Sequence, residues 1–505
     1  MKSTESNNSL LRNTLWLAWS GAINIANSVV LWLVLARWRT PAEVGQFAAV
    51  MSLYTIFITV CGLGLTPYLA SELSHRTERR RLAASATLLL LLSSGVCAVL
   101  MMLTGLFTGA GTQTATNILS LAILPTGLIA VGEAVFTALG QARVIAAATT
   151  TENLLRTVIP LALLYRGHSL PVICASFVLV RLAACAVYVL AAWRRFGLPP
   201  LPEWRAVRDL AGAAPTFAGV TVLAALHWQL GTVLAARLGG ANAAAQFGVA
   251  ARFLLPVTIL LWSYVSVIQP RAACLAQESL PRLGEFLAGC WRLTLALALP
   301  LAAGGLTLGS DLMTLLFGPT YADAAWALGL LAAGIVPFSL TMIASRGLIA
   351  TGRQHVDLLG NLAAVALNLI LNLLLIPRYG ATGAAAAQLF SLTAQALVAP
   401  EPQFTCPPPV ATVKVTAAFG TTFAIIFTAE WGDLTQLITA GQAARTGAPL
   451  SVFLGSWLAL TAVAGFGVLV GAWLQKRVPL WRIGIIGGVV LAILAAVTLV
   501  ELVRA

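Results

Sequence analysis

The chain has 505 residues, of which 59% are hydrophobic and only 9% are charged. These proportions, together with a mean hydropathy of +0.90, exclude an ordinary soluble globular protein and indicate a polytopic membrane protein. A net charge of +13 on a soluble protein would suggest a nucleic-acid partner. Here the basic residues fall mostly in loops between apolar runs, where they set topology, so we expect no nucleic-acid partner.

Apolar runs of helix length follow one another along the chain before residue 400. Helices of about 20 residues cross a bilayer with their backbone hydrogen bonds satisfied, so the runs predict an all-α polytopic membrane protein. With a cytoplasmic N-terminus, most arginines outside the spans fall on the inner side, which favours that orientation. The twelve spans are expected at 13–36, 44–71, 82–107, 115–139, 144–165, 170–193, 210–236, 245–270, 286–309, 323–350, 356–377 and 381–399.

A helix-turn-helix segment occurs twice in the chain. It covers 36–47 and returns at 236–247, and in both copies one apolar helix ends in Ala-Arg and the next opens with Gln-Phe. A second, shorter repeat relates 138–144, which closes the fourth span, to 350–356, which closes the tenth. Internal repeats of this kind are typical of membrane transporters, whose substrate site lies between the repeats.

The duplication predicts two six-helix lobes, at 1–195 and 210–399. The segment 196–209 between them is basic and contains several prolines and a tryptophan. That composition is typical of a cytoplasmic linker at the membrane interface.

Ionisable side chains inside a membrane span are costly and usually face a water-filled cavity or a partner. Arginine dominates among them here, which suits an anionic headgroup, because guanidinium pairs with phosphate in a forked geometry and keeps its charge. Glu152 and Arg156 are four residues apart, so an internal salt bridge is the alternative to a cavity role for Arg156. Arg181 and Arg252 have no local partner and are expected to line the cavity, with interhelical pairing as the alternative. Arg346 lies nearer the cytoplasmic end of its span, where snorkelling to the interface is the alternative.

Three polar residues complete the expected substrate cavity. Asn368 and Asn372 share one helix face with Asn361 and could contact sugar hydroxyls, or else make interhelical hydrogen bonds. His227 could protonate during transport, or else pack as a hydrogen-bonding residue. The residues assigned to the cavity are therefore Arg156, Arg181, Arg252, Arg346, His227, Asn368 and Asn372.

The first 400 residues contain no nucleophile–base pair, phosphate-binding glycine loop or metal-ligand cluster in the sequence. We therefore expect a transporter rather than an enzyme, and no bound cofactor.

The turn at 37–47 with Gly-Leu-Gly at 62–64, and the run from Gly352 through the three asparagines to Gly383, resemble the polysaccharide-type flippases of the MOP exporter superfamily. The resemblance covers about residues 10–399, and this group includes the O-antigen and lipid-linked oligosaccharide translocases. It implies two six-helix lobes that alternate between inward- and outward-facing states around a central cavity. It also implies a location in the bacterial inner membrane, with a lipid-linked glycan as substrate and membrane lipids as neighbours.

The sequence changes character after Val398. A proline-rich junction at 400–411 cannot form a helix interior, and a further module at 412–505 contains three more spans, at 412–441, 449–474 and 481–502. In the first of these spans, two carboxylates and an amide share a helix face. Such a set of oxygens suits a hard cation such as Ca²⁺ or Mn²⁺, and helix-end capping is the alternative. The candidate metal ligands are Glu430, Asp433 and Gln436.

The Glu-Trp-Gly-Asp motif at 430–433 resembles the GDT-type membrane proteins, regarded as manganese or calcium exporters that exchange for protons. The match covers about 413–503. Members normally carry two such motifs, one in each of two inverted three-helix repeats, whereas this chain has one copy. The resemblance therefore implies that a working ion site needs a second repeat in trans, from the same protein or a separate chain. A true fusion and a reading frame joined by deletion, frameshift or assembly error both account for the junction.

The main hypothesis is translocation of lipid-linked oligosaccharide or polysaccharide precursors by alternating access, with a fused half of a cation exporter. One alternative is an Mn²⁺ or Ca²⁺/proton exchanger in which the last module carries the only working activity. A second is MOP-type drug/cation antiport, which favours acidic rather than basic cavity residues.

Overall fold

The computed structural model describes residues 23–24, 27–75, 79–105, 110–197 and 200–398. Within these ranges the regular structure is helical and no strand occurs. The chain divides into two units, and every described residue lies in the first, Met1–Pro407. The expected three-helix module at 412–505 lies outside the described residues.

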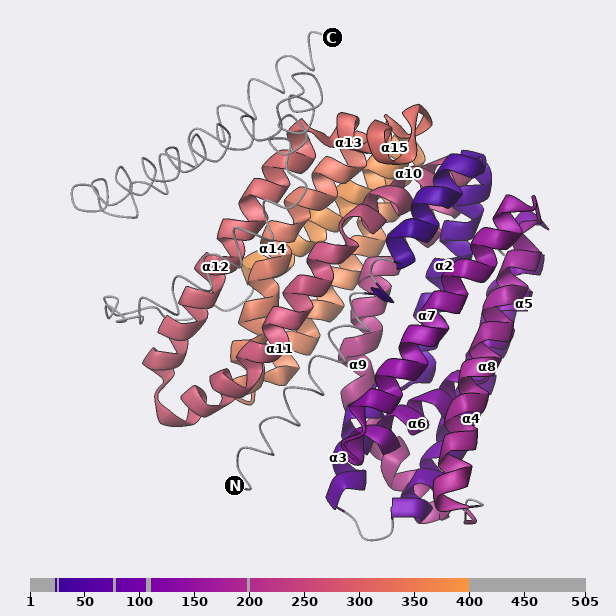
Figure 1. The fold of residues 1–505 in the computed structure, drawn as a ribbon. Coiled ribbons are helices and arrows are strands. Elements are labelled where there is room, and N and C mark those ends of the chain that lie inside the picture. Colours follow the sequence, from indigo (N-terminus) through magenta and orange to yellow (C-terminus); the bar gives the residue numbers. More distant parts are fainter. Residues whose placement is uncertain (1–22, 25–26, 76–78, 106–109, 198–199, 399–505) are drawn as a thin grey trace, which may run out of the picture. The chain divides into compact units, whose positions relative to one another are not determined.

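The first lobe follows the predicted spans closely (Figure 1). Its α2 helix starts with a capping box, in which Thr40 and Glu43 each satisfy a backbone N–H of the first turn, and Pro41 occupies a position that needs no donor. The helices of this lobe are Asn27–Trp38, α2 (Pro41–Cys61), α3 (Thr66–His75), α4 (Arg79–Gly105), α5 (Ala110–Ser120), α6 (Thr126–Ala138), α7 (Ala142–Tyr165) and α8 (Leu170–Phe196).

The second lobe repeats this order with two local differences. A π-helical turn, η2 (Ala235–Gly239), occupies the second copy of the duplicated turn. The last helix is a hairpin of two arms, because Gly380 adopts φ 54°, a left-handed conformation that favours glycine. The helices are α9 (Trp204–Leu234), α10 (Gly240–Phe253), α11 (Leu255–Glu278), α12 (Leu280–Thr307), α13 (Gly309–Phe317), α14 (Ala324–Ala350) and α15 (Gln354–Val398).

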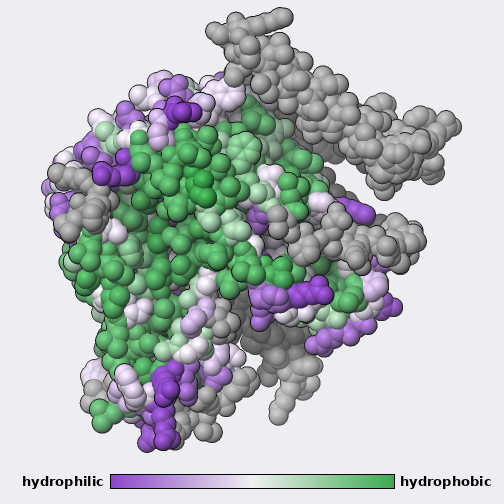
Figure 2. Space-filling model, turned by 180° about the vertical axis from the view of Figure 1, so that it is seen from behind, coloured by the Kyte–Doolittle hydropathy of each residue, from purple (hydrophilic) through white to green (hydrophobic). Residues whose placement is uncertain are grey.

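Eight helices in the described ranges are long and apolar enough to cross a membrane, so the chain is a multi-pass membrane protein. On the face shown in Figure 2, hydrophobic residues form a broad band with hydrophilic residues at both ends. Other helices account for part of the difference from twelve predicted spans. The helices α7 and α9 also have the length of a span, although α7 carries Glu152 and Arg156 within it, and α15 contains two spans in one hairpin. Of the first predicted span, the structure describes mainly Asn27–Trp38.

The predicted span at 245–270 begins in the wrong place. The chain breaks at Leu254, between α10 and α11, and Pro256 lies in the first turn of α11. Proline has no backbone N–H and favours a helix start, so the break separates a short α10 from a longer α11.

The two copies of the duplicated turn lead into helices that pack against each other. The α2 backbone at Gly45 lies directly on the Ala241 carbonyl of α10, and Gly248 of α10 faces Ala48 of α2 and the ring of Trp32. Small residues allow this close approach of two helices, which is how helices associate in lipid. The duplication therefore forms the contact between the two lobes.

Buried side chains follow the same division. One core cluster combines residues of both lobes around the α2–α10 crossing, including Phe47, Phe247 and Leu328. Three further clusters are smaller: one packs the start of α9 against α3, α4 and α6, one joins α6 to α8, and one joins α11, α12 and α14. The lobes thus share a core at the end that carries the duplicated turns, which the charge distribution predicts to be the outer end.

An arginine in the first copy of the duplicated turn strengthens the contact between the lobes at this end. Arg37 Nε donates a hydrogen bond of 2.8 Å to the Leu316 carbonyl, and Arg37 Nη2 donates one of 2.5 Å to the Leu315 carbonyl. Both acceptors lie in the last turn of α13, where helix carbonyls lack intrahelical partners and a cation is favourable. Arg37 therefore links the first lobe to the second.

Substitution of Gly45 by alanine tests the helix crossing. Alanine normally stabilises a helix by up to about 1 kcal/mol relative to glycine, but at Gly45 its methyl group would meet the Ala241 backbone. We expect Gly45→Ala to lower the thermal midpoint of the purified protein. Gly95→Ala in α4 is the matched control, since nothing lies within 4 Å of a methyl group there. Equal midpoints for the two variants would contradict the close approach.

Candidate functional site

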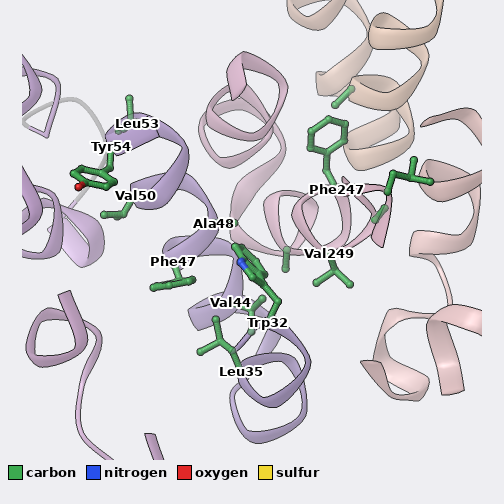
Figure 3. Close-up of a cluster of buried hydrophobic side chains, with 14 of the residues drawn as sticks. Trp32, Leu35, Val44, Phe47, Ala48, Val50, Leu53, Tyr54, Phe247 and Val249 are labelled. Atoms are coloured by element: carbon green, nitrogen blue, oxygen red, sulfur yellow. The ribbon is translucent and has the colours of Figure 1, made fainter. Parts of the chain in front are cut away.

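Arg252 lies at the contact between the lobes, in the last turn of α10. Its guanidinium carbon is 5.0 Å from the centre of the Trp32 ring, a cation–π contact. Trp32 is buried and packs on Phe47, with ring centres 5.4 Å apart. Figure 3 shows Trp32 beside Ala48 of α2, between α2 and the α10 helix that carries Val249. The first lobe therefore supplies the aromatic surface on which an arginine of the second lobe rests.

Among the residues that the structure describes, no carboxylate pairs with Arg252, and the ion pairs there join other side chains. A half-buried guanidinium with an aromatic face on one side keeps its N–H donors for a further acceptor. This arrangement suits an anionic ligand at the level where the lobes meet.

A second charged group joins α7 to α8. Glu152 is buried, and its Oε1 accepts a hydrogen bond of 2.6 Å from Arg181 Nη1. The same oxygen is 3.8 Å from Arg156 Nη1, and the Arg156 guanidinium lies 5.2 Å from the Phe177 ring centre. Both structural alternatives for these arginines, the i,i+4 pair and the interhelical pair, therefore occur around one carboxylate. A cavity of about 420 Å³ between α7 and α8 reaches Glu152, and a substrate role for the arginines stays a prediction.

Asn368 and Asn372 lie inside the α15 hairpin with no exposed surface. Asn368 Nδ2 donates to Gln388 Oε1 at 3.3 Å and to Ser391 Oγ at 3.2 Å, and Asn372 Nδ2 donates to Asn368 Oδ1 at 2.8 Å. Nearer the open end of the hairpin, Gln395 Nε2 donates to Asn361 Oδ1 at 3.2 Å. The asparagine face therefore holds the two arms together, and contact with sugar hydroxyls stays a prediction.

The last two predicted cavity residues lie apart from the others. Arg346 on α14 reaches across to α11, where its Nη1 is 3.4 Å from Gln269 Oε1. His227 on α9 is buried, and its Nε2 finds no hydrogen-bond partner among the described residues. The seven residues therefore occupy separate places, with Arg156 beside Arg181 and Asn368 beside Asn372. Arg252 lies at the lobe contact.

Several site residues were missed by sequence reasoning. Trp32 gave no signal, because its arginine partner lies on a helix far away in the sequence. Gln388 and Ser391 are three residues apart on the last span and so share a helix face, a signal that could have identified partners for the asparagines.

The candidate metal ligands Glu430, Asp433 and Gln436 lie outside the described residues. Within the described ranges, no group of three or more His, Cys, Asp and Glu side chains could hold a metal ion.

A double-mutant cycle tests the α7–α8 ion pair. Glu152→Leu leaves the buried Arg181 charge uncompensated, so we expect it to destabilise the protein by about 3–5 kcal/mol. Arg181→Met leaves Glu152 with Arg156 alone, at 3.8 Å, and should also destabilise the protein, by a smaller amount. The double variant should recover a large part of the Glu152→Leu loss, because the two most buried charges leave the interior together and the remaining Arg156 is partly exposed. Thermal unfolding in detergent measures all four proteins, and additive single effects would contradict the pairing.

Comparison with known proteins places this fold. The family model described as "Polysaccharide biosynthesis protein" matches residues 10–275, and the model "Divalent cation/proton antiporter GDT1" matches residues 418–505. A sequence search of curated proteins gave no match.

Solved structures similar to this chain are transporters of low sequence identity. The lipid II flippase MurJ in an inward closed conformation has a TM-score of 0.63 at 14% identity, covering 91% of this chain and 100% of that one. An inward-facing multidrug resistance MATE transporter of the MOP superfamily has a TM-score of 0.57 at 15% identity, covering 75% and 92%. A MOP superfamily transporter from Pyrococcus furiosus has a TM-score of 0.51 at 14% identity, covering 77% and 93%. At these identities the likeness establishes a shared fold.

The two-lobed helical fold and the matched families agree with the resemblances in the sequence. The chain belongs to the polysaccharide biosynthesis protein family, with a MOP-type transporter fold, and carries a GDT1 divalent cation/proton antiporter domain at residues 418–505.

Proposed function

We propose that the chain translocates lipid-linked oligosaccharide or polysaccharide precursors across the bacterial inner membrane by alternating access, with its N-terminus in the cytoplasm. The observation that carries this proposal is the Arg252 guanidinium at the contact between the lobes, which forms no ion pair with any residue in the described part of the chain. In this role Arg252 binds the phosphate groups that link the glycan to its lipid carrier.

The chemistry of Arg252 supports an anionic ligand. Its charge is permanent, and it can donate two parallel hydrogen bonds to phosphate oxygens. The Trp32 ring covers one face of the guanidinium, which fixes its orientation without neutralising it. Substrate sites of transporters with internal repeats lie between the repeats, and Arg252 is on the helix that follows the second duplicated turn.

The comparisons add two parallels from proteins of the same fold. MurJ is named as a lipid II flippase, and the Pyrococcus furiosus transporter is described by a reversed polarity of its binding pocket that suggests a different function. In this chain the predicted cavity charges are arginines. A basic site counts against drug/cation antiport, which favours acidic cavity residues.

The described conformation supports the inward-facing state of such a cycle. Helices of both lobes share one large core at the predicted outer end. At the other end α11, α12 and α14 form a cluster of their own, and only the start of α9 packs on the first lobe. Opening to the outside then requires that the α2–α10 crossing loosens and that Arg37 leaves the α13 carbonyls. The substrate site would then open first to one side of the membrane and then to the other, while the protein itself stays in place.

Substitution of Arg252 tests the glycan-lipid proposal. A charged hydrogen bond contributes about 1.5–3 kcal/mol, so we expect Arg252→Gln to reduce glycan export about 10- to 100-fold at unchanged protein level. Arg252→Lys should retain part of the activity, because it keeps the charge but loses the forked geometry. Arg282→Gln, on the exposed start of α12, is the charge-matched control. Normal export by the Arg252→Gln protein would remove Arg252 from the substrate site.

We propose divalent cation/proton exchange as a second activity, in the GDT1 domain at 418–505. Glu430, Asp433 and Gln436 would bind Mn²⁺ or Ca²⁺ as cargo, since their oxygens suit hard cations. The sequence carries one Glu-x-Gly-Asp motif in this domain, so a second repeat in trans, from another copy or a separate chain, would complete the site.

A substitution of Glu430 separates this activity from glycan export. We expect Glu430→Gln cells to lose manganese tolerance, because the charge that attracts the cation is gone, while their glycan export stays normal. The Arg252→Gln strain should show the opposite pair of phenotypes. Unchanged manganese tolerance in the Glu430→Gln strain would count against cation transport by this domain.

A further inference from the structure

An apolar groove lies within the first lobe, away from the contact between the lobes. The helices α4 and α8 both pack on α6, and between them lies a cavity of about 550 Å³. Leu88 and Leu91 of α4, Val135 of α6 and Val189 of α8 line it with hydrocarbon. Leu91 and Val189 are partly exposed, so the groove reaches the surface that lies in the membrane.

The mouth of the groove is basic. Arg79 and Arg80 line the cavity, and Arg81 follows them in the first turn of α4. Arg79 also donates a hydrogen bond of 3.0 Å to the Ser74 carbonyl. The partial positive charge at the amino end of the helix adds to the charge of the arginines, so the mouth of the groove attracts an anion. Trp193 of α8, a half-exposed residue that also lines the cavity, belongs to the type that collects at the lipid headgroup level.

We propose that this groove binds one anionic phospholipid of the inner leaflet. Its phosphate lies at the amino end of α4 against Arg79 and Arg80, and one acyl chain occupies the cavity. The volume is that of a site for a drug-sized ligand, which suits a single acyl chain and not a polyprenyl chain. Basic pockets between membrane helices on the cytoplasmic side recognise anionic headgroups through the same charges.

A bound lipid would also contact the segment that joins the lobes. Pro200 and Pro202 of the linker line the cavity. Nearby, a hydrogen bond joins the linker to α4, in which the Glu203 backbone N–H donates to Ser85 Oγ at 2.9 Å. The lipid therefore stabilises the start of α9 against the first lobe. This inference concerns binding and stability and does not depend on the transported substrate.

Lipid titration of the purified, delipidated full chain tests the proposal. Thermal midpoints and native mass spectra are recorded with phosphatidylglycerol, phosphatidylcholine, polyprenyl phosphate or inorganic phosphate. We expect phosphatidylglycerol alone to raise the midpoint strongly and to remain bound. The Arg79→Gln/Arg80→Gln variant should bind it about 20- to 30-fold more weakly, at about fivefold for each arginine lost.

Two further variants separate the groove from general surface charge. Ala192→Trp keeps all charges but fills the cavity from α8, so it should lose phosphatidylglycerol binding. Arg271→Gln/Arg282→Gln removes two exposed arginines of the second lobe and should bind normally. Equal binding of phosphatidylcholine, tighter binding of polyprenyl phosphate, an equal shift with inorganic phosphate, or normal binding by Ala192→Trp would each overturn the proposal.

Discussion

The arrangement of the described part of the molecule depends on a contact between two backbones. In lipid, apolar side chains gain little from leaving their surroundings, so helices associate where small residues let them come close. Gly45 and Ala241 provide that approach between α2 and α10, and Ala48 with Gly248 continues it. The shared core forms around this crossing, and it holds the Trp32 ring in the place where the Arg252 guanidinium rests on it. A larger side chain at the crossing would therefore change the charged site as well as the packing.

Each lobe contains an equivalent helical hairpin, and a different kind of polar contact joins the two helices in each lobe. The helices α7 and α8 are joined by the Glu152–Arg181 ion pair, and the two arms of α15 by hydrogen bonds of Asn368 to Gln388 and Ser391. Hydrogen bonds between neutral groups in membranes contribute modestly, whereas a buried ion pair that loses one partner costs several kcal/mol. The repeats therefore share a backbone plan, while the first lobe carries the more consequential polar contact.

Sequence patterns predicted the fold further than they predicted the site. Apolar runs located most helices to within a few residues, and the duplicated turns indicated two related lobes, because both signals are local. The break at Leu254 was accessible too, since Pro256 follows it. The pairing of Arg181 with Glu152 required the rotation of two helices about their axes, which hydropathy does not determine. The contact between Arg252 and Trp32 required the docking of one lobe on the other, which leaves no trace in either segment.

The link made by Arg37 requires a particular side chain on one partner only. Its guanidinium binds the carbonyls of residues 315 and 316, and every amino acid presents the same carbonyl at the end of a helix. Side-chain changes at those two positions leave the acceptors in place, so the chemical information for the link resides in one codon. A genetic search for mutants with a loosened outer end should return changes at Arg37, or changes that unwind α13, and few at the residues that Arg37 touches.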